Sequence, residues 1–167
     1  YPLRRQRQMC IRDREIISAG QSFAAVVDYA HTPDAVSRVL KSVRSFTSGR
    51  VIGILGCGGD RDKSKRLPMG QALFNGSDIA IFTSDNPRSE KAEAILKDMT
   101  DGIKMAEKGF VLTDRKDAIN FAAKSAKPGD CILLMGKGHE SGQEISGVIA
   151  PFDDRIELAN SIKQVIK

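Results

Sequence analysis

Short apolar runs recur along the chain, and four of them break off abruptly into clusters of polar residues. The strands that these runs predict span residues 23–27, 51–55, 79–83 and 131–135. A continuous apolar run of this length, rich in β-branched residues, is typical of a parallel strand covered on both faces. The pattern therefore predicts a buried, largely parallel sheet.

Between these strands, apolar residues recur at helical spacing. In residues 33–46, Thr32 is the expected N-cap and Pro33 takes the first helical position. We expect further helices around residues 68–74, from a Ser89 cap to about residue 103, after an Asp114 cap, and at residues 154–166. Each helix has an apolar stripe that can cover the sheet.

Strands and helices alternate along most of the chain. Shorter strands are expected at residues 15–17, 110–112 and 144–149, the last of them antiparallel. The closing helix is expected to bury Leu158, Ile162 and Val165. Such alternation predicts an α/β fold: a doubly wound, mostly parallel sheet with helices on both faces.

The polar clusters all directly follow predicted strands. They occupy residues 28–33, 56–63, 83–88 and 136–140. In an open α/β sheet, ligands bind outside the carboxyl ends of the strands. We therefore expect the four clusters to meet at one crevice.

The cluster Asp85-Asn86-Pro87-Arg88 combines a carboxylate, an amide and a guanidinium. This set suits an amino acid, because Asp can accept from an ammonium while Arg grips a carboxylate with two hydrogen bonds. The alternative is an ordinary turn that opens the helix at Ser89. The motif alone leaves both interpretations open.

Two other clusters suggest nucleotide chemistry without completing it. His31, after Tyr29, can stack on or hydrogen-bond a nucleotide, or can be a structural histidine beside an N-cap. Residues 136–140 place a cation, a base and a carboxylate among glycines, but no G-x-x-x-x-G-K-[ST] phosphate-binding loop occurs in the sequence. We expect no complete catalytic set and no metal site in this chain.

Charge and cysteine content narrow the class of protein. The net charge is +5, but residues 1–14 hold five arginines against one aspartate, so the remainder carries only +1. A nearly neutral domain lacks the basic face of a nucleic-acid binder. Three cysteines without metal or redox spacing, and no apolar run of membrane-spanning length, favour a cytoplasmic protein that does not contact a membrane.

Residues 1–14 differ in character from the rest. Residues 9–14 resemble the in-frame translation of a transposon-end adapter used in sequencing libraries. We interpret residues 1–14 as a leader, either an assembly artefact or a disordered basic tail, and expect the domain to span residues 15–167.

With these motifs in order and spacing, the chain resembles the C-terminal domain of the Mur ligases over residues 15–167. The motifs are Asp28-Tyr29-Ala30-His31-Thr32-Pro33, Gly56-Cys57-Gly58-Gly59-Asp60-Arg61-Asp62-Lys63, Asp85-Asn86-Pro87-Arg88 and Gly136-Lys137-Gly138-His139-Glu140. The resemblance is greatest to members that add meso-diaminopimelate to UDP-N-acetylmuramoyl-L-alanyl-D-glutamate in peptidoglycan synthesis. The family's UDP-sugar-binding domain and central ATPase domain have no counterpart in this sequence.

The resemblance implies a role for each cluster. The meso-diaminopimelate contacts would be Arg61, Asp85, Asn86, Pro87, Arg88, Gly136 and Glu140, and the nucleotide-facing residues Asp28, Tyr29, His31 and Thr32. The whole ligase would use ATP and Mg²⁺, held mainly by the central domain, to form an acyl phosphate that the diaminopimelate amine attacks. This domain would bind the amino acid and close over ATP.

Two other functions remain open at this point. One is a related amide ligase of the folylpolyglutamate or cyanophycin kind, against which the Asp-Asn-Pro-Arg motif argues. The other is a stand-alone binding module without catalytic activity.

Overall fold

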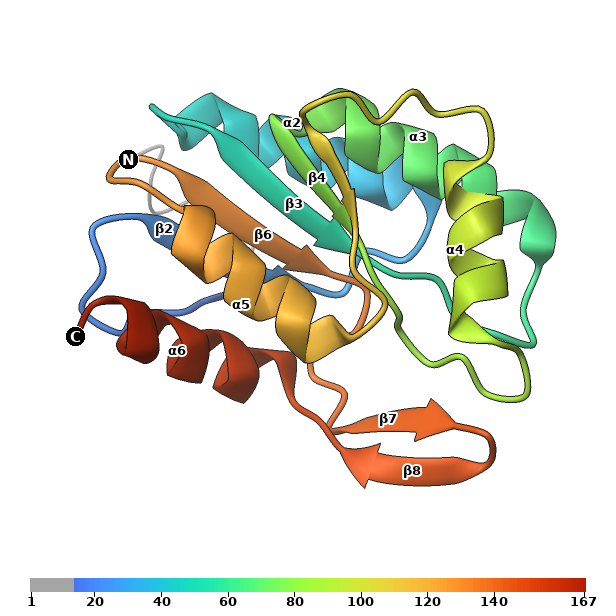
Figure 1. Ribbon diagram of the computed structural model, residues 1–167. Helices are drawn as coiled ribbons and strands as arrows, with labels where there is room; N and C mark the ends of the chain where they lie inside the picture. Colours follow the sequence, from blue (N-terminus) through green and yellow to red (C-terminus); the bar gives the residue numbers. More distant parts are fainter. Residues whose placement is uncertain (1–13) are drawn as a thin grey trace.

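A six-stranded sheet with helices on both faces forms the body of the computed structural model, which describes residues 14–167 (Figure 1). The strands, in the order β1-β2-β6-β3-β4-β5, are β1 (Arg14–Ile16), β2 (Ala24–Asp28), β6 (Cys131–Met135), β3 (Val51–Leu55), β4 (Ile79–Phe82) and β5 (Gly109–Val111). Within this sheet, only the edge strand β1 is antiparallel to its neighbour. The predicted α/β fold is confirmed.

The last residue assigned to the leader belongs to the described fold. Arg14, which we assigned to the leader, is the first residue of β1 and pairs with Asp28 across the sheet. Residues 1–13 of the predicted leader lie outside the described residues.

Two apolar cores lie on opposite faces of the sheet. Successive strand residues point to opposite faces, so Val51 and Leu55 of β3 enter one core while Ile52 and Ile54 enter the other. The first core is covered by α2 (Pro33–Phe46), α3 (Arg66–Gly76) and α4 (Ala92–Thr100), and the second by α5 (Arg115–Ser125) and α6 (Asp154–Val165). A short 3₁₀ helix, η1 (Lys63–Lys65), precedes α3.

Helix caps follow the predictions in two cases and differ in a third. Thr32 Oγ1 accepts from the backbone of α2, and the Asp114 carboxylate caps α5. Ser89, however, is not an N-cap: α4 begins three residues later, and the Ser89 hydroxyl donates instead to Asp60 Oδ1 at 2.5 Å. The prediction of Ser89 as a cap was wrong because its partner lies in another loop.

The C-terminal segment also departs from the predictions. The single strand expected at residues 144–149 is a hairpin, β7 (Gly142–Ile145) and β8 (Val148–Pro151), which forms a separate two-stranded sheet and projects beyond the main sheet (Figure 1). In α6, Leu158 and Ile162 are buried as expected, but Val165 is exposed at the helix end.

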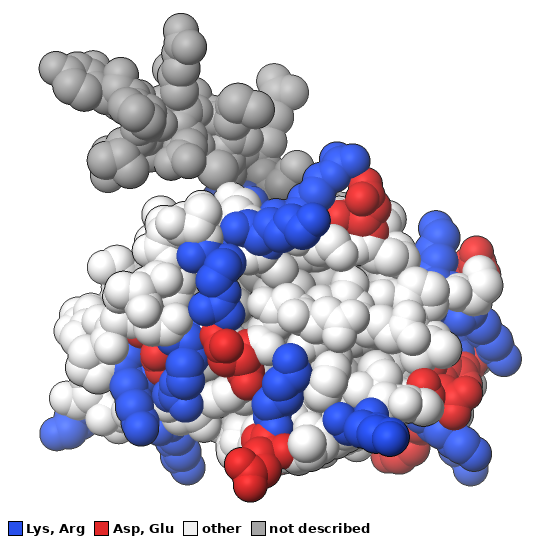
Figure 2. Space-filling model, turned by 90° about the horizontal axis from the view of Figure 1, so that it is seen from above, with Lys and Arg blue, Asp and Glu red and all other residues white. Residues whose placement is uncertain are grey.

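The surface charges are mixed in sign. On the face shown in Figure 2, Lys and Arg side chains are scattered among Asp and Glu and do not form one basic stripe. No helix in the described part of the chain combines the length and apolarity that a membrane crossing requires.

Candidate functional site

Loops that follow four of the parallel strands meet at one cavity of about 370 Å³. These loops leave the carboxyl ends of β2, β3, β4 and β6, where an open α/β sheet binds its ligands. The cavity is lined by Tyr29, His31, Gly56, Cys57, Gly58, Arg61, Asp62, Lys65, Arg66, Met69, Asp85, Asn86, Arg88, Gly136 and Glu140. The predicted convergence of the four clusters is therefore present.

All but one of the residues predicted to contact an amino acid line this cavity; the exception, Pro87, is buried behind them. Gly59 packs on Pro87 so closely that a Cβ atom at Gly59 would lie 1.8 Å from the Pro87 carbonyl oxygen. The Gly59 amide also donates to Asn86 O at 2.8 Å. This glycine therefore joins the loop after β3 to the loop after β4.

Arg88 is held by the loop after β3 and by the β7–β8 hairpin. Its guanidinium donates to Gly59 O at 2.9 Å and lies 3.7 Å from Glu144 Oε2. Its backbone, at φ 53°, donates to Glu144 O at 3.0 Å and accepts from Ser146 N at 2.7 Å. The side chain is 21% exposed and lines the cavity.

An ion-pair network centred on the buried Arg66 side chain lies at the rim of the cavity. Arg66 is almost fully buried; it donates to both carboxylate oxygens of Glu90 and, at 2.8 Å, to Asp98. The hydrogen bonds from Arg66, together with that from the Asp60 amide, lower the pKa of Glu90 to about 2. The Glu90 carboxylate therefore stays charged and ties the loop after β3 to the start of α4.

Lys137 is the buried cation at the base of the cavity. Its side chain is 0% exposed, and its Nζ lies 3.2 Å from Asp85 Oδ1, 2.9 Å from Asn86 Oδ1 and 3.4 Å from Glu140 Oε2. Sequence reasoning did not select Lys137 as a site residue. The feature of the sequence that could have identified Lys137 is its position between Gly136 and Gly138, in the motif from which Gly136 and Glu140 were selected.

A second buried cation, Arg115, holds the strand ends themselves. It donates to Ser84 O and to Met135 O, both at 3.1 Å, and these carbonyls directly precede Asp85 and Gly136. Its counter-ion is Asp154, which it contacts through two hydrogen bonds of 2.8 and 2.6 Å. Sequence reasoning missed Arg115, because an arginine after an N-cap is usually solvated.

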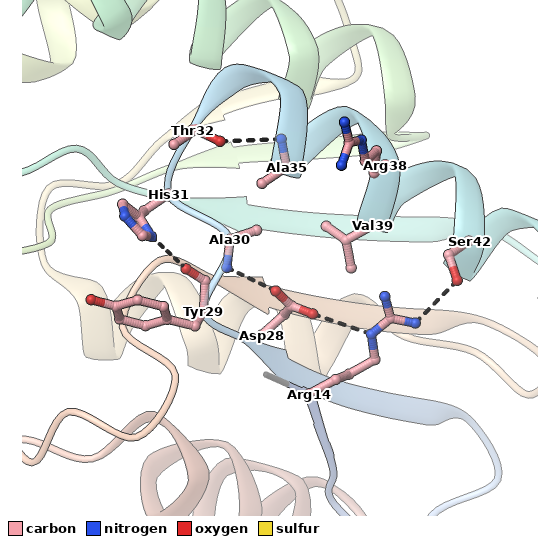
Figure 3. Close-up of a pocket in the computed structure, with 10 residues that line it drawn as sticks. All are labelled: Arg14, Asp28, Tyr29, Ala30, His31, Thr32, Ala35, Arg38, Val39 and Ser42. Atoms are coloured by element: carbon pink, nitrogen blue, oxygen red, sulfur yellow. Dashed lines mark hydrogen bonds and ion pairs between the residues drawn. The ribbon is translucent and has the colours of Figure 1, made fainter. Parts of the chain in front are cut away.

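The four residues predicted to face a nucleotide line a neighbouring cavity of about 420 Å³ (Figure 3). The Asp28 carboxylate already has hydrogen-bond partners within the protein, because it accepts from Ala30 N at 2.7 Å and from Arg14 Nε at 3.1 Å. The rings of Tyr29 and His31 are exposed, with centroids 4.6 Å apart, and both residues also line the first cavity. The two cavities thus share this pair of rings.

Cys57 lines the first cavity but is not an activated nucleophile. Burial, followed by the nearby Asp85 charge, raises the pKa of its thiol to about 12, and its sulfur packs 3.7 Å from that of Met69. Among residues 14–167, no group of three or more His, Cys, Asp or Glu side chains is placed to hold a metal ion. The first cavity is lined by side chains of both charge signs, including Arg61, Arg88, Asp85 and Glu140.

Comparison with known proteins assigns the chain to a family. The family model described as "Mur ligase, glutamate ligase domain" matches residues 14–138. The chain therefore belongs to the Mur ligase family, as the four motifs suggested.

Individual relatives are consistent with this assignment. The chain is 51% identical over 155 residues to the UDP-N-acetylmuramoyl-L-alanyl-D-glutamate--2,6-diaminopimelate ligase of Streptomyces coelicolor, covering 90% of this chain and 31% of that relative. It is 46% identical over 151 residues to the ligase of the same name from Geobacillus thermodenitrificans, covering 90% and 31%. A solved structure of a ligase of that name matches with a TM-score of 0.87 and 43% identity, covering 91% of this chain and 31% of the other. The chain thus spans about a third of the length of these relatives.

Proposed function

We propose that this chain is the C-terminal, amino-acid-binding part of an ATP-dependent ligase that adds meso-diaminopimelate to UDP-N-acetylmuramoyl-L-alanyl-D-glutamate. The observation that carries the proposal is the single cavity in which Arg61 and Arg88 lie with the carboxylates of Asp85 and Glu140. Meso-diaminopimelate carries two ammonium and two carboxylate groups, so it needs partners of both signs at both ends. We place the ligase in the cytoplasm, where ATP and nucleotide sugars are available.

Arg88 is the residue best suited to select the amino acid. Diaminopimelate is lysine with an additional carboxylate on its far carbon, and a guanidinium binds a carboxylate through two parallel hydrogen bonds. Glu140, with a side chain 40% exposed, is placed to accept from the far ammonium. Arg61 and Asp85 supply a second pair of opposite charges for the carboxylate and the amine at the other end of diaminopimelate.

The nucleotide would meet this part of the ligase through its base or ribose. Tyr29 and His31 offer exposed rings beside the amino-acid cavity, and Thr32 lines the same pocket. The side chains described here do not fit Mg²⁺, since they form no cluster of metal-binding groups within residues 14–167. We therefore assign Mg²⁺ and the phosphates, together with the UDP-linked substrate, to the remaining two thirds of the ligase.

The role of this chain in the reaction is then positioning. ATP with Mg²⁺ supplies the phosphoryl group that activates the D-glutamate side-chain carboxylate. The residues of the cavity hold diaminopimelate so that one amine, in its neutral form, faces that carboxylate while the far ammonium stays charged against Glu140. Orientation of this kind converts a bimolecular step into an effectively unimolecular one, and closure excludes water that would hydrolyse the activated carboxylate.

The test is the substrate preference of full-length ligase variants. Arg88→Ala should lower kcat/KM for meso-diaminopimelate about tenfold to a hundredfold, which corresponds to about 1.5–3 kcal/mol for a charge-assisted contact. Lysine, which lacks the far carboxylate, should be affected far less. Glu140→Gln should lower kcat/KM for both substrates, because both carry the far ammonium.

Arg88 also braces two loops, so a control for its structural role is needed. Arg88→Lys keeps a charge but loses the paired geometry, and it should fall between wild type and Arg88→Ala. An equal loss for diaminopimelate and lysine in Arg88→Ala would mean that Arg88 only supports the loops, and the substrate assignment would fail.

A further inference from the structure

The side-chain amide of Asn86 is held in one orientation by its neighbours. Its oxygen accepts from Lys137 Nζ at 2.9 Å and from the Glu144 amide at 3.0 Å, while its nitrogen donates to Glu140 Oε2 at 3.1 Å. Turning the amide over would set an NH₂ group against two donors and an oxygen against a carboxylate. The orientation is therefore determined by charge and hydrogen bonding.

This orientation leaves a hydrogen-bond donor for the cavity. A primary amide has two N–H groups, and one of those of Asn86 is used by Glu140. The second has no partner within the described residues 14–167, and Asn86 lines the cavity. A donor at this place suits a carboxylate and does not suit an ammonium.

Lys137 is the charged donor among the three groups that set this orientation. Its ammonium is fully buried and cannot contact a ligand itself. It lies between the oxygens of Asp85, Asn86 and Glu140, so it also separates two carboxylates that would otherwise repel each other.

We propose that Lys137 is a positioning residue for substrate selection: it turns the Asn86 amide so that its NH₂ group donates to the far carboxylate of the bound amino acid. The inference rests on the proposed function, because it names the residue behind the carboxylate-reading end of that site. Arg88 supplies the charge at this end, and Asn86, set by Lys137, supplies a second donor.

The affinity test uses the 167-residue chain and isothermal titration calorimetry with meso-diaminopimelate and with L-lysine. Lys137→Met, which keeps the unbranched chain as far as Cε but removes the ammonium, should lower the affinity for meso-diaminopimelate about tenfold and change the affinity for lysine less than about threefold. In an Asn86→Ala background, Lys137→Met should change the ratio of the two affinities less than about twofold. Lys124→Met, at an exposed position on α5, is the matched control and should change neither affinity.

A measurement without substrate comes from NMR of the same chain. In the wild type, the Lys137 ammonium should give a slowly exchanging signal with a nuclear Overhauser contact to the Asn86 side chain. The Asn86 NH₂ resonances should shift or broaden in Lys137→Met and stay in place in Lys124→Met. If Lys137→Met does not fold, the same measurements are made on Lys137→Gln, which removes the charge but keeps an NH₂ group with two N–H donors. The ammonium signal of the wild type then provides the second test.

The outcomes separate this inference from the proposed function. If the wild-type chain binds neither amino acid but the Asn86 resonances respond to Lys137→Met, the proposed function fails and the positioning of Asn86 stands. The inference is overturned if the Asn86 resonances do not respond to Lys137→Met. It is also overturned if Lys137→Met lowers the affinities for meso-diaminopimelate and lysine equally, or if it lowers the affinity for meso-diaminopimelate by the same factor in the wild-type and Asn86→Ala backgrounds.

Discussion

Arg115 and Asp154 form an ion pair in which neither side chain has any exposed surface. Burial opposes the charge on Arg115, but the Asp154 carboxylate, together with the charges of Asp85 and Glu140, more than offsets this effect and raises the pKa of the guanidinium. Replacing Asp154 with Leu would therefore leave a charged guanidinium buried without its counter-ion. The Arg115 guanidinium would then keep only two hydrogen-bond partners, Ser84 O and Met135 O.

The expected cost follows from the burial of the pair. Removing one partner of a buried ion pair typically destabilises a protein by about 3–5 kcal/mol. For a chain of this size, 1 kcal/mol corresponds to about 2–4 °C in Tm, so Asp154→Leu should lower Tm by about 6–20 °C. Asp153, the N-cap of α6, is retained, so the loss of a helix cap does not contribute.

The assay is thermal and urea denaturation of the 167-residue chain, both monitored by circular dichroism, for Asp154→Leu, Arg115→Met and the double variant. The double variant removes both charges, so it should recover part of the loss, with a coupling energy of at least about 1 kcal/mol between the two sites. A loss below about 1 kcal/mol in Asp154→Leu, or simple additivity of the two changes, would refute the view that this pair holds the strand ends.

Two further predictions concern the loops around the cavity. Because the pKa of Glu90 is lowered to about 2 in the folded state from an ordinary value of 4.5, its charge stabilises the fold above pH 4.5, and this contribution is lost as the pH falls toward 2. Glu90→Gln should thus lower the free energy of unfolding at pH 7, and the difference from wild type, measured by urea denaturation, should shrink between pH 4.5 and 2; a constant difference would contradict this. Gly59→Ala should cost about 1–3 kcal/mol, because its Cβ would lie 1.8 Å from the Pro87 carbonyl oxygen and the loop would have to move. If Gly59→Ala leaves Tm unchanged relative to Ser64→Ala, a control in the adjacent 3₁₀ helix η1, the loop adjusts without cost and the prediction is contradicted.

The four clusters illustrate which parts of a site follow from local pattern. Apolar strand-length runs and helical periodicity are properties of neighbouring residues, so β3 and α2 have the bounds that the pattern predicted. Once the strands are parallel, their carboxyl ends must lie at the same edge, and the residues that follow them meet there. The place of the candidate cavity therefore follows from the amino-acid sequence alone.

Contacts between distant residues decided the rest. Serine is a common N-cap residue, but the Ser89 hydroxyl donates to the carboxylate of Asp60, 29 residues earlier in the chain. Periodicity assigns Val165 to the apolar face of α6, although the helix end is exposed. The partner of Ser89 and the exposed end of α6 both depend on how elements pack, which local pattern does not encode.

The buried cations show the same limit at the site itself. Lys137 meets Asp85 across 52 positions of sequence, and Arg115 meets Asp154 across 39. From the sequence alone, each is an ordinary charged residue that water would solvate at little cost. The sequence by itself determined the fold class, the order of its elements and the edge of the sheet where the clusters meet. Only the tertiary structure decided which charges are removed from water and which partners must therefore compensate them, because burial is a property of the assembled chain.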